Sequence, residues 1–286
     1  MNNTTKPFGS WEDAVSWLRR QSDKQDLVIA SYYDDPLMAS ATRYWQSEEW
    51  AGVRRLLPAC GGQALDVGAG RGIASFALAK DGFQVTALEP DGSALVGAQA
   101  IRSLAAASGL SIEVTQEFSE RLPFKDKQFD VVFARAVLHH TRDLAEACRE
   151  FLRVLKPGGA LIAVREHVIS RVEDLPVFLD AHPLHNIYGG ENAFLLSQYK
   201  AAINDAGFQL SEVLAPLRSA VNYAPHSLDD LKLAIAQKLT ARLPSLTRAV
   251  FEALTGPIVW WGVRHLLELI DHRPGRLYSF VARRPE

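Results

Sequence analysis

Between residues 63 and 164, short apolar runs alternate with segments of helical pattern, and this alternation constrains the fold more than any other feature. The helical segments cover residues 73–80, 93–108 and 143–155. The apolar runs are ALDVG, FQVTALEP, SIEVTQ, FDVVFA and ALIAV. Apolar strands that alternate with helices are typical of a parallel sheet whose two faces are both covered. The sequence therefore predicts an α/β fold, with a mostly parallel sheet and helices on both faces.

The rest of the chain predicts helical additions on both sides of this region. Residues 1–57 are expected to form an N-terminal helical cap, because apolar residues recur at helical spacing from Ser10 onwards. Residues 58–172 are expected to form the core. Residues 173–286 are expected to supply a loop, the remaining strands and a helical insertion over 228–270, which precedes a last strand, RLYSFVARR.

Composition limits the class of function. The 31 Lys and Arg against 33 Asp and Glu give a formal charge of −2, which disfavours a nucleic-acid binder. Two cysteines, Cys60 and Cys148, suit a reducing compartment. The first residues lack the pattern of a secretory leader, and no window of about 18 residues is free of charge. We therefore expect a cytoplasmic protein with no membrane span.

A glycine-rich loop, LDVGAGRG (residues 65–72), lies where the first strand should end and a helix begin. Such glycines allow a tight turn and the close approach of a ligand to the backbone, although they also fit an ordinary turn. Asp66 would repel a pyrophosphate on this loop and favour a cationic group such as an ammonium. Glu89 ends the next strand, and an acidic residue at that distance can accept both hydroxyls of a ribose. Asp66 and Glu89 together predict a nucleoside ligand without a diphosphate.

Four ordered pieces of sequence resemble the class I S-adenosylmethionine-dependent methyltransferases, in particular the ubiquinone/menaquinone-biosynthesis type (methyltransferase domain 11-like). The pieces are ALDVGAGRG, ALEPDGSAL, SERLPFKDKQFDVVFARAVLHH and EFLRVLKPGGALIAV. The resemblance implies that residues 58–172 form a Rossmann-like core that binds S-adenosyl-L-methionine and releases S-adenosyl-L-homocysteine.

The resemblance also implies which residues bind each part of the cofactor. The methionine part falls to Asp66, Gly68, Ala69, Gly70 and Gly72, the ribose to Glu89 and Pro90, and the adenine to Phe118, Ser119 and Glu120. Phe118 departs from the family, in which many members carry Asp. A phenyl ring can stack on adenine but cannot accept a hydrogen bond from its amino group. A core position is the alternative for Phe118.

Histidines follow the fourth and fifth predicted strands, at the sheet edge where ligands bind in open α/β folds. His139, His140 and His167 are the candidate general bases, because an imidazole titrates near neutral pH. Packing or cofactor contact is the alternative for His139 and His140, and a solvated loop is the alternative for Glu166-His167.

Residues 180–191 concentrate polar and aromatic groups in an expected loop. Its candidate acceptor-binding residues are His182, His185, Tyr188 and Glu191. His182 and His185 could pair on a metal with Glu191 or Glu166. Pro183 disfavours a regular helix between the two histidines, and we expect no metal.

Residues 257–270 form an amphipathic segment that contains Trp260-Trp261. It predicts either a helix buried on the core or peripheral contact with a membrane surface or a lipid-linked substrate. The oligomeric state is left open by the sequence.

These features predict a methyltransferase that acts on a small or carrier-linked metabolite. Oxygen is the favoured acceptor atom because of the candidate histidine bases, with carbon and nitrogen as alternatives. A non-catalytic module that binds S-adenosylmethionine or S-adenosylhomocysteine is the rival hypothesis. An NAD(P)-dependent oxidoreductase is a further one, but it should lack a carboxylate at Asp66.

Overall fold

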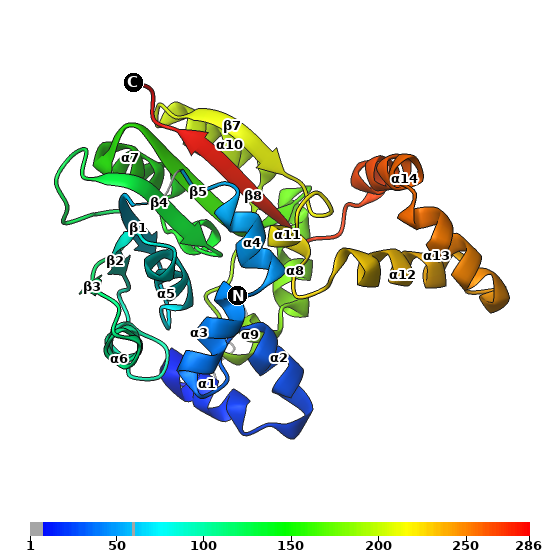
Figure 1. The fold of residues 1–286 in the computed structure, drawn as a ribbon, viewed down its shortest axis with the longest axis horizontal. Coiled ribbons are helices and arrows are strands. Elements are labelled where there is room, and N and C mark those ends of the chain that lie inside the picture. Colours follow the sequence, from blue (N-terminus) through cyan, green and yellow to red (C-terminus); the bar gives the residue numbers. More distant parts are fainter. Residues whose placement is uncertain (1–7, 59–60) are drawn as a thin grey trace.

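The structure, a computed structural model, describes residues 8–58 and 61–286, so that Cys60 and the first seven residues lie outside the described ranges. Within them, eight strands form one sheet in the order β3-β2-β1-β4-β5-β8-β7, and β6 pairs with β5 (Figure 1). The strands are β1 (Gln63–Val67), β2 (Gln84–Leu88), β3 (Ile112–Thr115), β4 (Phe129–Arg135), β5 (Leu155–Ile169), β6 (Phe194–Leu195), β7 (Gln209–Leu214) and β8 (Arg276–Arg283).

The pairing of these strands confirms the predicted fold class. All pairs among strands β1 to β6 are parallel. Strand β8 runs antiparallel to both β5 and β7. Because β1 lies between β2 and β4, the strand order reverses at β1. Ligands of open α/β sheets bind at such a point, beyond the carboxyl ends of the strands.

The helices cover the sheet and extend beyond it. They are α1 (Trp11–Arg19), α2 (Gln25–Ala30), α3 (Leu37–Trp45), α4 (Glu48–Arg54), α5 (Ile73–Lys80), α6 (Ala98–Ser108), α7 (Leu144–Val154), α8 (Leu175–Ala181), α9 (Pro183–Ile187), α10 (Leu196–Asp205), α11 (Ala220–Tyr223), α12 (Leu228–Leu239), α13 (Thr247–Thr255) and α14 (Pro257–Ile270). Short 3₁₀ turns are η1 (Ser22–Lys24), η2 (Leu138–His140), η3 (Val172–Asp174) and η4 (Pro244–Leu246).

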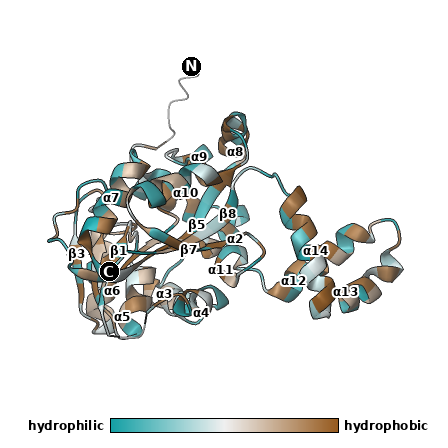
Figure 2. Ribbon diagram, turned by 90° about the horizontal axis from the view of Figure 1, so that it is seen from above, coloured by the Kyte–Doolittle hydropathy of each residue, from teal (hydrophilic) through white to brown (hydrophobic). Residues whose placement is uncertain are grey.

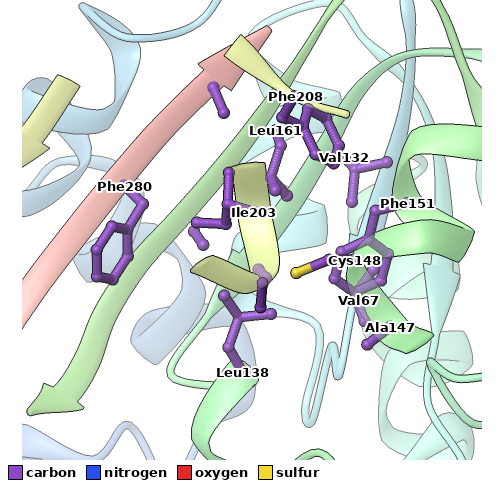
Figure 3. Packing of buried hydrophobic residues seen from close by; sticks show 14 of the residues in the cluster. Val67, Val132, Leu138, Ala147, Cys148, Phe151, Leu161, Ile203, Phe208 and Phe280 are labelled. Carbon is purple, nitrogen blue, oxygen red and sulfur yellow. The ribbon is translucent and has the colours of Figure 1, made fainter. Parts of the chain in front are cut away.

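Alternate residues of β4 point to opposite faces of the sheet, as the period of a strand requires. Val132 and Ala134 belong to a core cluster that includes side chains of α7 and α10. Figure 3 shows part of this cluster, with Cys148 of α7 beside the strands. Val131 and Phe133 belong to a second cluster with α3, α4 and α5. Both faces of the sheet are therefore buried, which explains why the central strands are apolar without alternation.

Two helix boundaries differ from the prediction. The helix expected over 93–108 begins only at Ala98, because Asp91 caps the preceding turn: its side chain accepts a hydrogen bond from the Ser93 N–H and its carbonyl accepts one from the Ala98 N–H. The loop expected over 180–191 is partly helical, since it contains the end of α8 and the whole of α9. Pro183 starts α9, because proline is compatible with the first turn of a helix.

Strand β5 is longer than the run ALIAV that predicted it. It starts at Leu155 and continues through Glu166 and His167, which were expected to lie beyond its end. Two register shifts accommodate this length, one against β4 before Ala160 and one against β8 around Arg165. Arg165 has a φ of 62°, so the strand bends there. After this bend, Glu166 and His167 lie at the carboxyl edge of the sheet.

Helices α12, α13 and α14 project from the body of the protein as an arm, in both views of the ribbon (Figures 1 and 2). An ion pair between Arg218 and Glu268 (3.0 Å) lies at its base. No residue of α14 is buried, and Ile258, Trp261 and Leu269 are 84%, 60% and 74% exposed. The prediction that this segment is buried on the core is therefore wrong. No helix in the described ranges has both the length and the apolar character needed to cross a membrane.

The exposure of the arm predicts that its apolar side chains contribute little to stability. Trp261→Ser and Leu269→Ser should each change the free energy of unfolding by less than about 0.5 kcal/mol. Phe280→Ala, which empties a fully buried core position, should cost about 3–5 kcal/mol. Urea unfolding followed by circular dichroism measures all three. A loss of about 2 kcal/mol or more in either arm variant would contradict the exposed position of α14.

Candidate active site

A cavity of about 830 Å³ opens at the carboxyl edge of the sheet. Its volume is typical of small-molecule and cofactor sites. The predicted site residues that line it are Asp66, Gly68, Ala69, Gly70, Glu89, Pro90, Phe118, Ser119, Glu120, His139, His140, His167, His182, Tyr188 and Glu191. Gly72 and His185 do not belong to its lining. One cavity therefore brings together residues from the glycine loop, from η2, from β5 and from the segment around α9.

The glycine loop needs its glycines for conformation and for space. Gly68 and Gly70 have φ values of 59° and 55°, in the left-handed region that side chains disfavour. A Cβ atom on Gly68 would also lie 2.7 Å from the side chain of Val137. The Ala69 N–H donates to the carbonyl of Leu88 (3.0 Å), which ties the loop to the end of β2. The backbone of this loop is thus exposed to a ligand and held in place.

Glu89 joins the glycine loop to the segment after β2. Its carboxylate accepts hydrogen bonds from the Gly70 N–H (2.7 Å) and the Asp91 N–H (2.9 Å). Burial raises the pKa of Glu89 above its ordinary value. A carboxylate has about four acceptor positions, so that two backbone bonds leave capacity for hydroxyl groups of a ligand in the cavity.

Asp66 is buried at the end of β1 and accepts a hydrogen bond from the Ser75 hydroxyl (2.5 Å). Burial raises the pKa of Asp66 to about 7, because water no longer stabilises its charge. A cation placed beside Asp66 would lower this pKa again, so that the site favours positively charged ligands.

Phe118 is 50% exposed, so the alternative that it is a core side chain is wrong. The guanidinium carbon of Arg142 lies 5.1 Å from the centre of its ring. Glu120 accepts hydrogen bonds from the Arg142 N–H (2.7 Å) and from the Ser119 hydroxyl (3.1 Å). Glu120 therefore fixes the turn before α7, while the ring of Phe118 presents a flat apolar surface at the cavity.

Opposite the glycine loop, Glu166 organises the segment after β4. It is fully buried and accepts hydrogen bonds from the Val137 N–H (3.1 Å), the His139 N–H (3.1 Å) and Nδ1 of His139 (2.7 Å). These contacts leave Nε2 of His139 free to face the cavity, where it lies 3.5 Å from Oε2 of Glu191.

The charges of His139 and Glu191 depend on each other. Burial alone would lower the pKa of His139, but the carboxylates of Glu166 and Glu191 outweigh it and raise that pKa to about 9. Burial would raise the pKa of Glu191, but His139, His140 and His182 outweigh it and hold the pKa at about 2. Glu191 is thus a stable anion in the cavity.

Three more imidazoles surround Glu191. Nδ1 of His140 donates to the carbonyl of Gly190 (2.9 Å), and Nδ1 of His167 donates to the carbonyl of Gly275 (3.0 Å). Nδ1 of His182 lies 3.8 Å from Oε1 of Glu191. Burial is the main cause that lowers the pKa of His167 to about 3, and the positive charge of His139 is the second. His167 is therefore neutral. The cluster therefore combines the protonated imidazole of His139 and the neutral imidazole of His167 with the partly buried carboxylate of Glu191.

His185 does not join this cluster. Its backbone N–H donates to Nδ1 of His182 (3.3 Å), and its own Nδ1 is buried without a hydrogen-bond partner among the described residues. His182 and His185, which the sequence offered as an alternative metal pair, do not converge on one site in the described residues, because His182 uses Nδ1 to cap α9.

A buried ion pair that the sequence analysis missed connects the N-terminal cap to the cavity wall. Glu49 of α4 accepts hydrogen bonds from Arg135 (2.6 and 3.1 Å), and Arg165 lies 3.7 Å away. Burial alone would raise the pKa of Glu49, but the two guanidinium groups outweigh it and lower the pKa. The one signal in the sequence is an arginine that ends a mostly apolar strand, FDVVFAR.

Aromatic side chains of the N-terminal cap, Trp11, Tyr32 and Tyr33, line part of the cavity. Trp11 contacts Tyr33 (ring centres 5.8 Å apart) and also Tyr188 beyond α9 (5.1 Å). The cap and the segment around α9 therefore meet over the cavity. Burial raises the pKa of Tyr33 to about 12, so that Tyr33 is neutral.

Comparisons with known proteins identify the family of the chain. The family model of the methyltransferase domain matches residues 65–163. The chain is 30% identical over 180 residues to the ubiquinone/menaquinone biosynthesis C-methyltransferase of Klebsiella pneumoniae, and the match covers 58% of this chain and 68% of that protein. It is 40% identical over 270 residues to a glycine/sarcosine/dimethylglycine N-methyltransferase of Actinopolyspora halophila, covering 92% of this chain and 47% of that protein.

The fold also matches solved structures. A putative sarcosine dimethylglycine methyltransferase from Galdieria sulphuraria superposes with a TM-score of 0.58 and 17% identity, over 96% of this chain and 98% of that one. Among eight curated relatives, the matched segment covers from 32% to 85% of the relative's own length. The chain belongs to the class I S-adenosylmethionine-dependent methyltransferases, in the subgroup of the ubiquinone/menaquinone biosynthesis enzymes. Its cofactor is S-adenosylmethionine.

The buried ion pair behind the cavity predicts a large effect of one substitution. Glu49→Ala would leave Arg135 and Arg165 buried without their carboxylate, and should lower the free energy of unfolding by about 3–5 kcal/mol. Denaturant unfolding measures this loss. Glu48→Ala, one residue earlier and on the exposed side of α4, is the matched control and should change stability by less than about 0.5 kcal/mol. Equal stabilities of the two variants would contradict the ion pair.

Proposed function

We propose that the protein transfers the methyl group of S-adenosylmethionine to an oxygen atom of a small molecule bound in this cavity. One observation carries the proposal: the glycine loop and the imidazole cluster around Glu191 line the same cavity. The loop suits the cofactor, and the cluster suits a hydroxyl group that must lose a proton.

The cofactor half of the cavity is assigned from charge and hydrogen bonding. Asp66 and the backbone of Gly68 to Gly70 hold the cationic methionine part, because Asp66 gains most from a nearby positive charge. Glu89 binds the ribose hydroxyls, with Pro90 beside it. The ring of Phe118 stacks on the adenine, next to Ser119 and Glu120. Gly72 acts indirectly: it has a φ of 82° and starts α5, so it shapes the loop without lining the cavity.

The acceptor half is assigned to the cluster as a unit. The candidate bases His139, His140 and His167 all belong to it, as do His182 and Glu191, while Tyr188 lines the same wall. In the proposed step the acceptor O–H bond breaks, its proton passes to the neutral Nε2 of His140 or to water in the cavity, and an oxygen lone pair forms the new O–CH₃ bond. The C–S bond breaks with its electron pair moving to sulfur, which becomes the neutral thioether of S-adenosylhomocysteine. Alignment of oxygen, methyl carbon and sulfur is the main contribution of the protein.

Nitrogen is a second candidate acceptor atom. The relative from Actinopolyspora halophila is named as an N-methyltransferase of glycine, sarcosine and dimethylglycine, and its match runs over 92% of this chain. An amine acceptor could be held by the carboxylate of Glu191. The test of the proposal therefore has to locate the transferred methyl group on a specific atom.

Methyl-labelled S-adenosylmethionine incubated with the protein and a metabolite extract tests the proposed function. Mass spectrometry should find a labelled small molecule whose fragments place the methyl group on oxygen. A label on nitrogen or carbon would overturn the choice of acceptor atom. Tight cofactor binding without any labelled product would support the rival hypothesis of a non-catalytic binding module.

The assignment of Glu89 to the ribose predicts a specific loss of affinity. Glu89→Gln keeps the shape of the side chain but removes its charge, so it should weaken S-adenosylhomocysteine binding by about 1.5–3 kcal/mol. Isothermal titration calorimetry measures the change. Glu113→Gln, on an exposed position of β3, is the control and should bind normally. Unchanged affinity in a folded Glu89→Gln variant would argue against the ribose site.

A further inference from the structure

We infer that His139, His167 and Glu191 bind one divalent transition-metal ion in the acceptor half of the cavity. Each offers one ligand atom, and these atoms all lie within 4.8 Å of one another. The three residues come from separate elements: η2, strand β5 and the segment after α9. The fold, rather than a local sequence motif, therefore creates the group.

Each imidazole is already oriented as a metal ligand. Nδ1 of His167 donates to the carbonyl of Gly275 (3.0 Å), and a carbonyl can only accept, so that the neutral ring keeps its lone pair on Nε2. Nδ1 of His139 is bonded to the carboxylate of Glu166 (2.7 Å), so that Nε2 faces the cavity. A metal ion that binds this nitrogen displaces the proton that Nε2 otherwise holds toward Glu191 (3.5 Å). Metal-ligating histidines characteristically hold their other nitrogen on a carbonyl or a carboxylate in this way.

The charge around the site suits a cation. Glu191 supplies one negative charge as a ligand, and the buried carboxylate of Glu166 supplies another behind His139. Oε2 of Glu191 lies 3.5 Å from Nε2 of His139 and 3.7 Å from Nε2 of His140. Nδ1 of His182 lies 3.8 Å from the other oxygen of Glu191. The positively charged Arg135 and Arg165 at the cavity wall are held by Glu49 on the other side.

The donor set indicates the kind of ion. Two imidazole nitrogens and one carboxylate oxygen suit zinc or ferrous iron, whereas magnesium and calcium prefer oxygen ligands alone. The longest separation of 4.8 Å exceeds the spacing of about 3.4 Å that bonds of about 2.1 Å impose on a tetrahedral site. Binding therefore draws the three side chains together and leaves the fourth position open to the acceptor.

A metal at this place would explain how the acceptor loses its proton, an interpretation that rests on the proposed O-methylation. A hydroxyl oxygen bound to the open position has a lowered pKa, because the cation stabilises the oxyanion. The O–H bond breaks, the proton passes to water in the cavity, and the oxygen keeps the electron pair that forms the O–CH₃ bond. The metal does not change its oxidation state.

Metal binding can be measured without methyl transfer. The full chain, stripped with a chelator and dialysed, should bind one equivalent of Zn²⁺ in calorimetry and should give the absorption bands of coordinated Co²⁺ in the visible range. His167→Ala and Glu191→Gln should each weaken Zn²⁺ binding by more than about tenfold and alter the Co²⁺ spectrum. His272→Ala, at an exposed histidine just after α14, is the control and should bind as the unaltered chain does. Thermal unfolding of each variant establishes that it is folded.

Absence of stoichiometric binding, or binding that both cavity variants leave unchanged, would overturn the metal site. Such a result would not affect the proposed function, which the labelling experiment tests separately. Conversely, binding that depends on His167 and Glu191 would establish the metal site even where no O-methylated product is found, and only the proposed function would then fail.

Discussion

The parallel order β2-β1-β4-β5 is the constraint on which the rest of the structure depends. It places the carboxyl ends of neighbouring strands at one edge, so that residues far apart in the chain share one cavity. Asp66 lies near the end of β1 and Glu89 directly after β2. His139 lies in the segment after β4, and His167 lies near the end of β5. Because both faces of the sheet are buried by helices, this edge is the place where polar side chains of the strands meet solvent or a ligand.

Buried charge divides the cavity into two halves of different chemistry. On the proposed cofactor side, burial raises the pKa of Asp66 to about 7, so that a cationic ligand would stabilise its carboxylate. On the proposed acceptor side, Glu191 is an anion surrounded by imidazoles. Glu49 offsets part of the positive charge of Arg135 and Arg165 on the wall between β4 and β5, which reduces their repulsion of a sulfonium. The electrostatic arrangement therefore accepts a cation on one side and a group that releases a proton on the other.

Features set by local sequence could be predicted, and those set by packing could not. The glycine loop, Asp66 and Glu89 follow from strand–turn–helix chemistry within about twenty-five residues, which is why their shared place at the cavity was expected. The group of His139, His167 and Glu191 needs the bend in β5 at Arg165, and no local pattern encodes that bend. The amphipathic pattern of α14 predicts a helix but not which surface covers its apolar side. Pro183 disfavours a helix between His182 and His185 on sequence grounds, but it occupies the first turn of α9, where proline is tolerated.

A structure of the protein with S-adenosylhomocysteine bound tests the central claim most directly, namely that one cavity holds the cofactor beside the cluster around Glu191. The nucleoside should occupy the cavity with its ribose hydroxyls on Glu89 and its adenine on the ring of Phe118. Its sulfur should face the side of Glu191, with space for an acceptor between them. A nucleoside bound away from Glu89, or a sulfur that points away from Glu191, would contradict the claim.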